Sequence, residues 1–127
     1  MNFPRGDMKS FSENFIAEDT VISRARARGV EVGSENTSPL VGSLLRYLTH
    51  LVGASSVVEV GTGSGVSALW IFKGLPSNGV LTSIDNEAEH AKITRTALDE
   101  AGIATTRYRL IVGRSEEHTS ELQSPYV

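Results

Sequence analysis

Hydrophobic residues recur at helical spacing in the first part of the chain, between positions 11 and 28. The apolar positions there are Phe15, Ile16, Val21, Ile22 and Ala25. Three arginines lie near the end of this stretch and Gly29 follows it. Because cations and a following glycine both favour a helix C-terminus, the pattern predicts one helix that ends at Gly29. Residues 30–37 are expected to form a loop.

A second helix is predicted to begin at Ser38 and Pro39. Serine caps free N–H groups, and proline at the first helical position loses no available hydrogen bond. Apolar residues then follow largely at i, i+4 spacing: Leu40, Val41, Leu44, Leu45, Leu48, Leu51 and Val52. Gly53 is expected to end the helix. So wide an apolar stripe predicts a helix that is buried in the core.

Short apolar runs alternate with helical segments over the next part of the chain. Strands are expected at 56–60, 80–84 and 108–112, and helices at 66–74 and 86–101. The latter helix is expected to be capped by Asn86 with Glu89, and Gly102 is expected to stop it. Its predicted buried residues are Ala91, Thr94, Leu98 and Ala101. This order of elements is typical of α/β proteins, and specifically of half of a doubly wound sheet with three parallel strands, here preceded by helices.

Composition narrows the classes of function. The chain has 127 residues, 12 Lys+Arg, 15 Asp+Glu, a net charge of -3 and no cysteine. One domain at most fits this length. An acidic balance argues against a nucleic-acid partner, and the lack of cysteine excludes disulfides and thiolate chemistry. Without a membrane span or an apolar signal core in the sequence, we expect a cytoplasmic protein with no membrane partner.

The last segment, residues 114–127, differs from the rest because no apolar face can be drawn on it. Residues 114–124 match, residue for residue, the translation of a common sequencing adapter. We therefore interpret 114–127 as a non-native or disordered tail and set it apart from fold reasoning. The remaining chain is nearly neutral.

The chemistry of the chain is expected in the turn after the first strand. Gly61, Gly63 and Gly65 alternate there, which allows a tight turn and close approach of a ligand. The following helix directs its N–H groups and positive dipole end at the turn. Asp85 lies at the end of the second strand, where a carboxylate faces a ribose in this topology. Together these features predict a nucleoside-containing cofactor; the alternative is a tight turn beside a surface carboxylate.

The spacing of glycines helps to identify the nucleoside. A dinucleotide fingerprint places its third glycine at position 66, which is Val66 here. Glu59 lies two residues before Gly61, and the pattern Glu59-x-Gly61-x-Gly63-x-Gly65 resembles motif I of class I S-adenosylmethionine (SAM)-dependent methyltransferases. In such a site Glu59 would accept from the ammonium of SAM, directly or through a water molecule. Thr62 and Ser67 would donate to its carboxylate.

Longer segments resemble the bacterial catechol-type O-methyltransferase family over roughly residues 15–113. They are 36–45, 57–67 followed by Leu69-Trp70, and 79–85. The resemblance implies methyl transfer from SAM to a hydroxyl of a small-molecule acceptor. It also implies a SAM site formed by Thr37, Glu59, Gly61, Thr62, Gly63, Ser67, Asp85 and Asn86. Thr37 would line the methionine end, and Asn86 would lie beside the adenosine.

Members of that family continue with further strands and an acidic cluster that often holds a divalent metal and orients the acceptor. The resemblance thus implies an inactive N-terminal fragment, with a cap and loop at 1–37 and a partial SAM-binding domain at 38–113. No catalytic or metal-binding residue can be named from the sequence. Whether the protein forms a homodimer is left open. We also expect the edge and apolar side chains of residues 57–60 to be exposed, with poor solubility or partial unfolding as the result. Two alternatives remain: half of a nicotinamide-dependent oxidoreductase, and a non-catalytic nucleoside-binding module.

Overall fold

The computed structural model describes residues 5–113, and the expectation for residues 114–127 lies outside them. Its elements are α1 (Arg5–Phe15), α2 (Thr20–Glu31), α3 (Pro39–Leu51), β1 (Ser56–Val60), α4 (Val66–Gly74), β2 (Val80–Asp85), α5 (Ala88–Glu100), a 3-10 turn (Thr105–Arg107) and β3 (Tyr108–Val112). The strands form one parallel sheet in the order β1-β2-β3. This confirms the predicted α/β class and the predicted succession of strands and helices.

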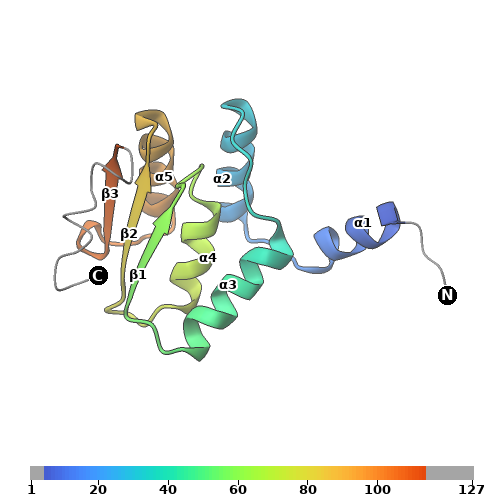
Figure 1. The fold of residues 1–127 in the computed structure, drawn as a ribbon, viewed down its shortest axis with the longest axis horizontal. Helices are drawn as coiled ribbons and strands as arrows, with labels where there is room; N and C mark the ends of the chain where they lie inside the picture. The colour runs from blue at the N-terminus through green and yellow to red at the C-terminus, as the bar shows by residue number, and fades with distance from the viewer. Residues whose placement is uncertain (1–4, 114–127) are drawn as a thin grey trace.

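Helices cover one face of this sheet, with β2 as the central strand (Figure 1). Side chains alternate between the two faces of a strand, and the register places Val57 beside Leu81 and Leu81 beside Tyr108. These three residues belong to or pack against a core that also contains Ile22, Ala25, Leu69, Trp70, Phe72, Ala97 and Leu98. The core therefore lies between the sheet and helices α4 and α5, and it continues between these two helices and α2.

The N-terminal stretch forms two helices, so the prediction of one helix over 11–28 is wrong. The Asp19 side chain accepts from the N–H of Ile22 at 2.9 Å and caps a new helix, α2. Gly29 does not end α2 but is buried inside it. A Cβ there would lie 2.2 Å from Asn36 Nδ2, so this glycine is required for close packing of the loop that follows. Helix α1 extends away from the other elements (Figure 1).

Helix α3 begins as predicted, because the Ser38 side chain accepts from the N–H of Val41 at 3.3 Å and Pro39 is its first residue. Its predicted burial is wrong. Only Gly42 and Thr49 are buried, on the side that contacts α4. The exposed apolar residues of this region are Leu40, Val41, Leu44, Leu48, Leu51 and Val52. The apolar stripe is present as predicted, but most of it stays exposed within residues 5–113, while Leu45 packs against the core.

Strand β1 is one edge of the sheet, and the predicted exposure of the apolar side chains of residues 57–60 is confirmed for Val58 and Val60 but not for Val57. Val58 is 41% exposed and Val60 is 68% exposed. Val57 and Glu59 on the opposite face are half-buried. A separate finding concerns membranes: in the described part of the chain no helix combines the length and apolar character needed to cross a bilayer.

We expect the isolated chain to self-associate as its concentration rises. The unpaired edge of β1 and the apolar stripe of α3 both present surfaces that other copies can cover. Sedimentation velocity over a concentration series measures this directly. A monodisperse monomer that unfolds cooperatively would contradict the expectation.

Helix α5 begins differently from the prediction, since Ala88 is its first residue and no side chain caps it. The Asp85 carboxylate, rather than Asn86, binds the backbone here, with Oδ1 accepting from the N–H of Glu87 at 2.9 Å. Of the residues predicted to be buried, Thr94 and Leu98 are buried, Ala91 is half-buried and Ala101 is exposed. Ala97 is buried as well. Gly102 follows at a φ of 73° and ends the helix as expected. The other carboxylate oxygen of Asp85, Oδ2, is left to accept from the turn after β1.

Candidate functional site

A cavity of about 410 Å³ lies at the carboxyl ends of β1 and β2. Three segments line it: Gly33, Ser34, Glu35, Asn36 and Thr37; Gly61, Thr62, Gly63 and Ser67; and Asp85, Asn86 and His90. Seven of the eight residues predicted for the cofactor site are among them. The eighth, Glu59, contacts the lining residue Ser67. The structure thus brings the whole predicted set together in one place.

Asp85 binds the glycine-rich turn directly. Its Oδ2 accepts from the N–H groups of Thr62 at 2.9 Å and Gly63 at 3.3 Å, and its side chain is 7% exposed. Burial by itself raises the pKa of this carboxyl. Hydrogen bonds from the Glu87 N–H, from His90 and from the Gly63 N–H outweigh burial, so the pKa of Asp85 is lowered. Asp85 is therefore an ionised carboxylate held firmly beside the turn.

Glu59 lies on the other side of the turn and accepts two hydroxyl hydrogen bonds. Ser83 donates to Oε1 at 2.7 Å, and Ser67 donates to Oε2 at 2.8 Å. Burial raises the pKa of Glu59, the two hydroxyls lower it, and the negative charge of Asp85 raises it further, with a net increase. Each carboxylate oxygen keeps a lone pair for a ligand cation.

A chain of hydroxyl groups connects Glu59 to the turn. Ser83 is 0% exposed, and its Oγ lies 2.7 Å from Thr62 Oγ1. Because the single Ser83 hydroxyl proton is donated to Glu59, Thr62 must donate to Ser83. The Thr62 backbone N–H is already bound to Asp85. The two carboxylates are consequently coupled through Thr62 and Ser83.

Sequence reasoning missed three residues that shape this site. Ser83 pairs in register with Glu59, a signal that becomes readable only once strands are paired. His90 holds its Nδ1 3.1 Å from Asp85 Oδ2 and its Nε2 3.4 Å from Glu87 Oε2. Asn36 Oδ1 accepts from the N–H of Ser64 at 3.3 Å and fixes the preceding loop against the turn. No local pattern indicates this last contact.

The glycines of the turn have different roles. Gly61 has a φ of 92° and a Cβ on it would meet nothing within 4 Å, so space for a ligand lies on that side. Gly65 has a φ of 97°, and a Cβ there would lie 3.2 Å from Ala97 Cβ and 3.3 Å from Thr94 Cα. Gly65 is therefore required where α5 packs on the turn.

Alanine at these two glycines should have unequal effects on stability. We expect Gly65→Ala to lower the free energy of unfolding by about 3 kcal/mol, because left-handed strain adds to a clash with α5. Gly61→Ala should cost only about 1 kcal/mol, from the backbone strain alone. Urea unfolding of both variants checks the prediction. Equal losses would contradict the assigned roles.

No metal-binding site is found among the described residues. Among residues 5–113 no group of three or more His, Cys, Asp or Glu side chains is placed to hold a metal ion. Two of the carboxylates at the cavity, Glu59 and Asp85, accept from hydroxyl and N–H donors. Their arrangement suits an organic ligand with a cationic group and hydroxyl groups.

Sequence comparison finds relatives among the candidate O-methyltransferases of mycobacteria. A candidate O-methyltransferase of Mycolicibacterium vanbaalenii is 49% identical over 111 residues, which is 87% of this chain and 49% of the relative. A candidate O-methyltransferase of Mycobacterium ulcerans is 45% identical over 115 residues, which is 91% of this chain and 51% of the relative. The chain thus spans about half the length of these relatives.

Solved structures agree with the observed fold. The O-methyltransferase TomG of Streptomyces achromogenes, in complex with SAM, superposes with a TM-score of 0.80 at 30% identity, covering 93% of this chain and 53% of TomG. An O-methyltransferase of Bacillus cereus in complex with SAH (S-adenosylhomocysteine) gives 0.81 at 22% identity over 94% of this chain and 55% of that protein, a likeness of fold alone. The O-methyltransferase family matches residues 10–124. By this match and by the identity of its relatives, the chain belongs to the O-methyltransferase family.

Proposed function

We propose that this chain is the cofactor-binding part of an O-methyltransferase that transfers the methyl group of SAM to a hydroxyl of a small molecule. The observation that carries the proposal is the position of the turn after β1, which lies between two coupled carboxylates, Glu59 and Asp85. The SAM bound to the related TomG supports the choice of cofactor. On this proposal residues 38–113 form the partial SAM-binding domain and residues 1–37 its helical cap and loop.

The residues present fit the chemical groups of SAM. Asp85 would accept from the ribose hydroxyls, since it is ionised and lines the cavity. Glu59 would accept from the ammonium group. The single Ser67 hydroxyl proton is donated to Glu59 in the free chain, so Ser67 would donate to the methionine carboxylate only after turning away from Glu59. The open space beside Gly61 would leave room for the ligand. The remaining proposed binding residues, all in the cavity lining, are Thr37, Thr62, Gly63 and Asn86. Thr62 already donates its N–H to Asp85 and its hydroxyl to Ser83, so the expected donation from Thr62 to the methionine carboxylate is not available in the free chain.

When bound, SAM supplies an electrophilic methyl group on a sulfonium. Transfer also requires an acceptor oxygen held in line at near-attack distance. We propose that the groups that hold the acceptor belong to the half of the relatives that this chain does not match, and that the chain alone is inactive. Family membership and the Glu59 contacts favour this function over a nicotinamide-dependent oxidoreductase.

Isothermal titration of the chain with SAM and with NAD tests the proposal. We expect saturable binding of SAM at one site and no binding of NAD. Binding of NAD alone would replace the proposal by the oxidoreductase alternative. Failure of both ligands with a sample shown to be folded by circular dichroism would favour the non-catalytic module and contradict SAM binding.

A further inference from the structure

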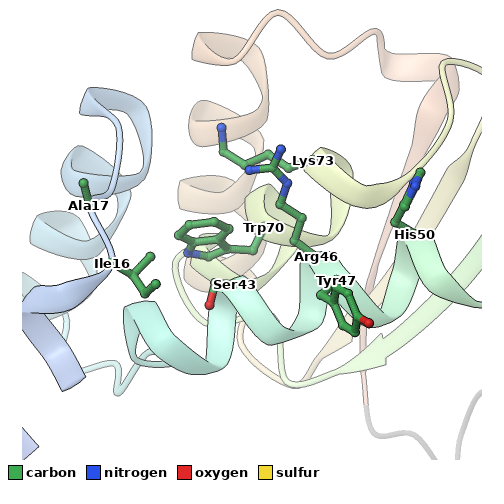
Figure 2. Close-up of a pocket in the computed structure, with 8 residues that line it drawn as sticks. All are labelled: Ile16, Ala17, Ser43, Arg46, Tyr47, His50, Trp70 and Lys73. Atoms are coloured by element: carbon green, nitrogen blue, oxygen red, sulfur yellow. The ribbon is translucent and has the colours of Figure 1, made fainter.

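A second cavity, of about 580 Å³, lies between α3, α4 and the segment that joins α1 to α2 (Figure 2). It shares no lining residue with the candidate cofactor cavity. Its lining residues are Ile16, Ala17, Ser43, Arg46, Tyr47, His50, Trp70 and Lys73. Basic and apolar side chains are present, but no carboxylate lines it. A cavity with this lining is suited to an anion.

The close crossing of α3 and α4 brings the basic side chains together. A Cβ on Gly74 would lie 2.3 Å from the Arg46 backbone oxygen, and one on Gly42 would lie 2.3 Å from the Trp70 indole. The two helices therefore approach at glycines, and side chains at the crossing converge. In Figure 2 Arg46 and Lys73 reach toward the same region beside Trp70, whereas Tyr47 lies farther along α3.

The acidic residues nearest to this cavity already have partners. Glu18 accepts two hydrogen bonds from Arg26, both at 2.8 Å, and one from the Trp70 indole at 3.0 Å. Asp19 Oδ2 lies 2.7 Å from the ammonium of Lys73. The Arg46 guanidinium has no ion pair or hydrogen bond within residues 5–113. The cavity thus keeps uncompensated positive charge.

We propose that this cavity binds a phosphate monoester that carries a small apolar group. The guanidinium of Arg46 presents a planar fork that matches phosphate oxygens, and Lys73 adds a second positive charge. The Arg46 charge is available to a phosphate oxygen because no carboxylate within residues 5–113 pairs with it, whereas Lys73 shares its ammonium with Asp19. Ile16 and Ala17, together with Trp70, provide the apolar wall.

The site is separate from the proposed cofactor site. Ser67 lines the cofactor cavity in the first turn of α4, whereas Lys73 lies in its last turn. At 1.5 Å per residue these positions are about 9 Å apart along the helix axis. Occupation of the second cavity therefore does not require SAM, and its test is independent of the proposed function.

Phenyl phosphate is the probe for this proposal. Trp70 is the only tryptophan of the chain, so tryptophan fluorescence reports directly on the cavity. We expect a saturable change with phenyl phosphate, weaker binding of inorganic phosphate and no response to phenol. Arg46→Ala should weaken phenyl phosphate binding at least about tenfold, because a charge-assisted hydrogen bond is lost. The control Arg24→Ala, an exposed arginine on α2 outside the cavity, should bind as the wild type does.

The same titrations can also contradict the proposal. No saturable change with phenyl phosphate, or equal affinities for Arg46→Ala and Arg24→Ala, would overturn the site. Benzoate binding as tightly as phenyl phosphate would show a carboxylate site instead and would also overturn the proposal. Competition by SAM would contradict its independence from the cofactor cavity. Circular dichroism verifies folding, and Arg46→Gln serves if the alanine variant does not fold.

Discussion

Replacement of Asp85 by alanine is expected to lower the affinity of the chain for SAM at least about 100-fold. Hydrogen bonds from two ribose hydroxyls to an ionised carboxylate are each worth about 1.5–3 kcal/mol, and tenfold in affinity corresponds to about 1.4 kcal/mol. The variant also removes the acceptor of the N–H groups of Thr62, Gly63 and Glu87, so the turn loses its anchor. Isothermal titration of Asp85→Ala with SAM measures the loss.

A control separates loss of the ligand contact from loss of charge near the cavity. Glu89 is an exposed carboxylate at the start of α5 that does not line the cavity, so Glu89→Gln should bind SAM as the wild type does. Circular dichroism establishes that each variant is folded, and Asp85→Asn provides a variant of the same shape if the alanine does not fold. Unchanged affinity in a folded Asp85 variant would be incompatible with a ribose contact there.

The second large effect is expected at Glu59, where Glu59→Gln should weaken SAM binding about 30-fold. The amide keeps the size of the side chain but loses the negative charge that would pair with the ammonium group. Burial and the charge of Asp85 raise the pKa of Glu59 by more than the two serine hydroxyls lower it. The carboxyl is therefore partly protonated in mildly acidic solution. The wild type should therefore bind SAM more tightly as the pH rises through that pKa.

Stability of the free chain should change with pH in the opposite direction at this residue. A carboxyl whose pKa is higher in the folded than in the unfolded state favours folding while it is protonated. Its contribution falls as the pH rises from the unfolded pKa to the raised one. Asp85, with a lowered pKa, contributes stability that is present above its unfolded pKa and lost as the pH falls through the folded value.

Titrations at about pH 5 and about pH 8 distinguish the two carboxylates. Asp85 stays ionised over this range because its pKa is lowered, so the part of the pH dependence that Glu59→Gln removes belongs to Glu59. The SAM affinity of Glu59→Gln should therefore change less between the two pH values than that of the wild type. The same pH dependence in wild type and Glu59→Gln would rule out Glu59 as the source.

Local patterns were sufficient for the regular elements around the site. Strand β1, helix α4 and strand β3 have the predicted bounds. Each is a short apolar run or helix bounded by glycine or turn residues, and these signals act within a few positions along the chain. Ser38 likewise caps α3 as its sequence indicates.

The failures arise where a distant part of the chain decides the outcome. The sequence around Gly29 is typical of a helix end, but Gly29 packs against Asn36 and Ser64 and stays inside α2. The stripe of α3 predicts burial, yet an amphipathic pattern does not specify the partner that covers it. Asn86 is of a residue type that caps helices, but the Asp85 carboxylate accepts from the Glu87 N–H instead.

The candidate site shows the same division. Glu59 and Asp85 were predictable because a motif places them at fixed distances from the glycines. Ser83 and His90 complete their hydrogen bonding from a neighbouring strand and a helix, so their roles depend on strand register and helix position. A sequence pattern is sufficient to predict the two carboxylates, whereas the hydrogen-bond donors that shift their pKa values are brought to them by the tertiary structure.

A crystal structure of the chain with S-adenosylhomocysteine would test the central claim most directly. The account predicts density for the ligand in the cavity beside Gly61, with the ribose hydroxyls on Asp85 and the amino group on Glu59. Ligand bound elsewhere on the chain, or in that cavity with neither carboxylate in contact, would contradict it.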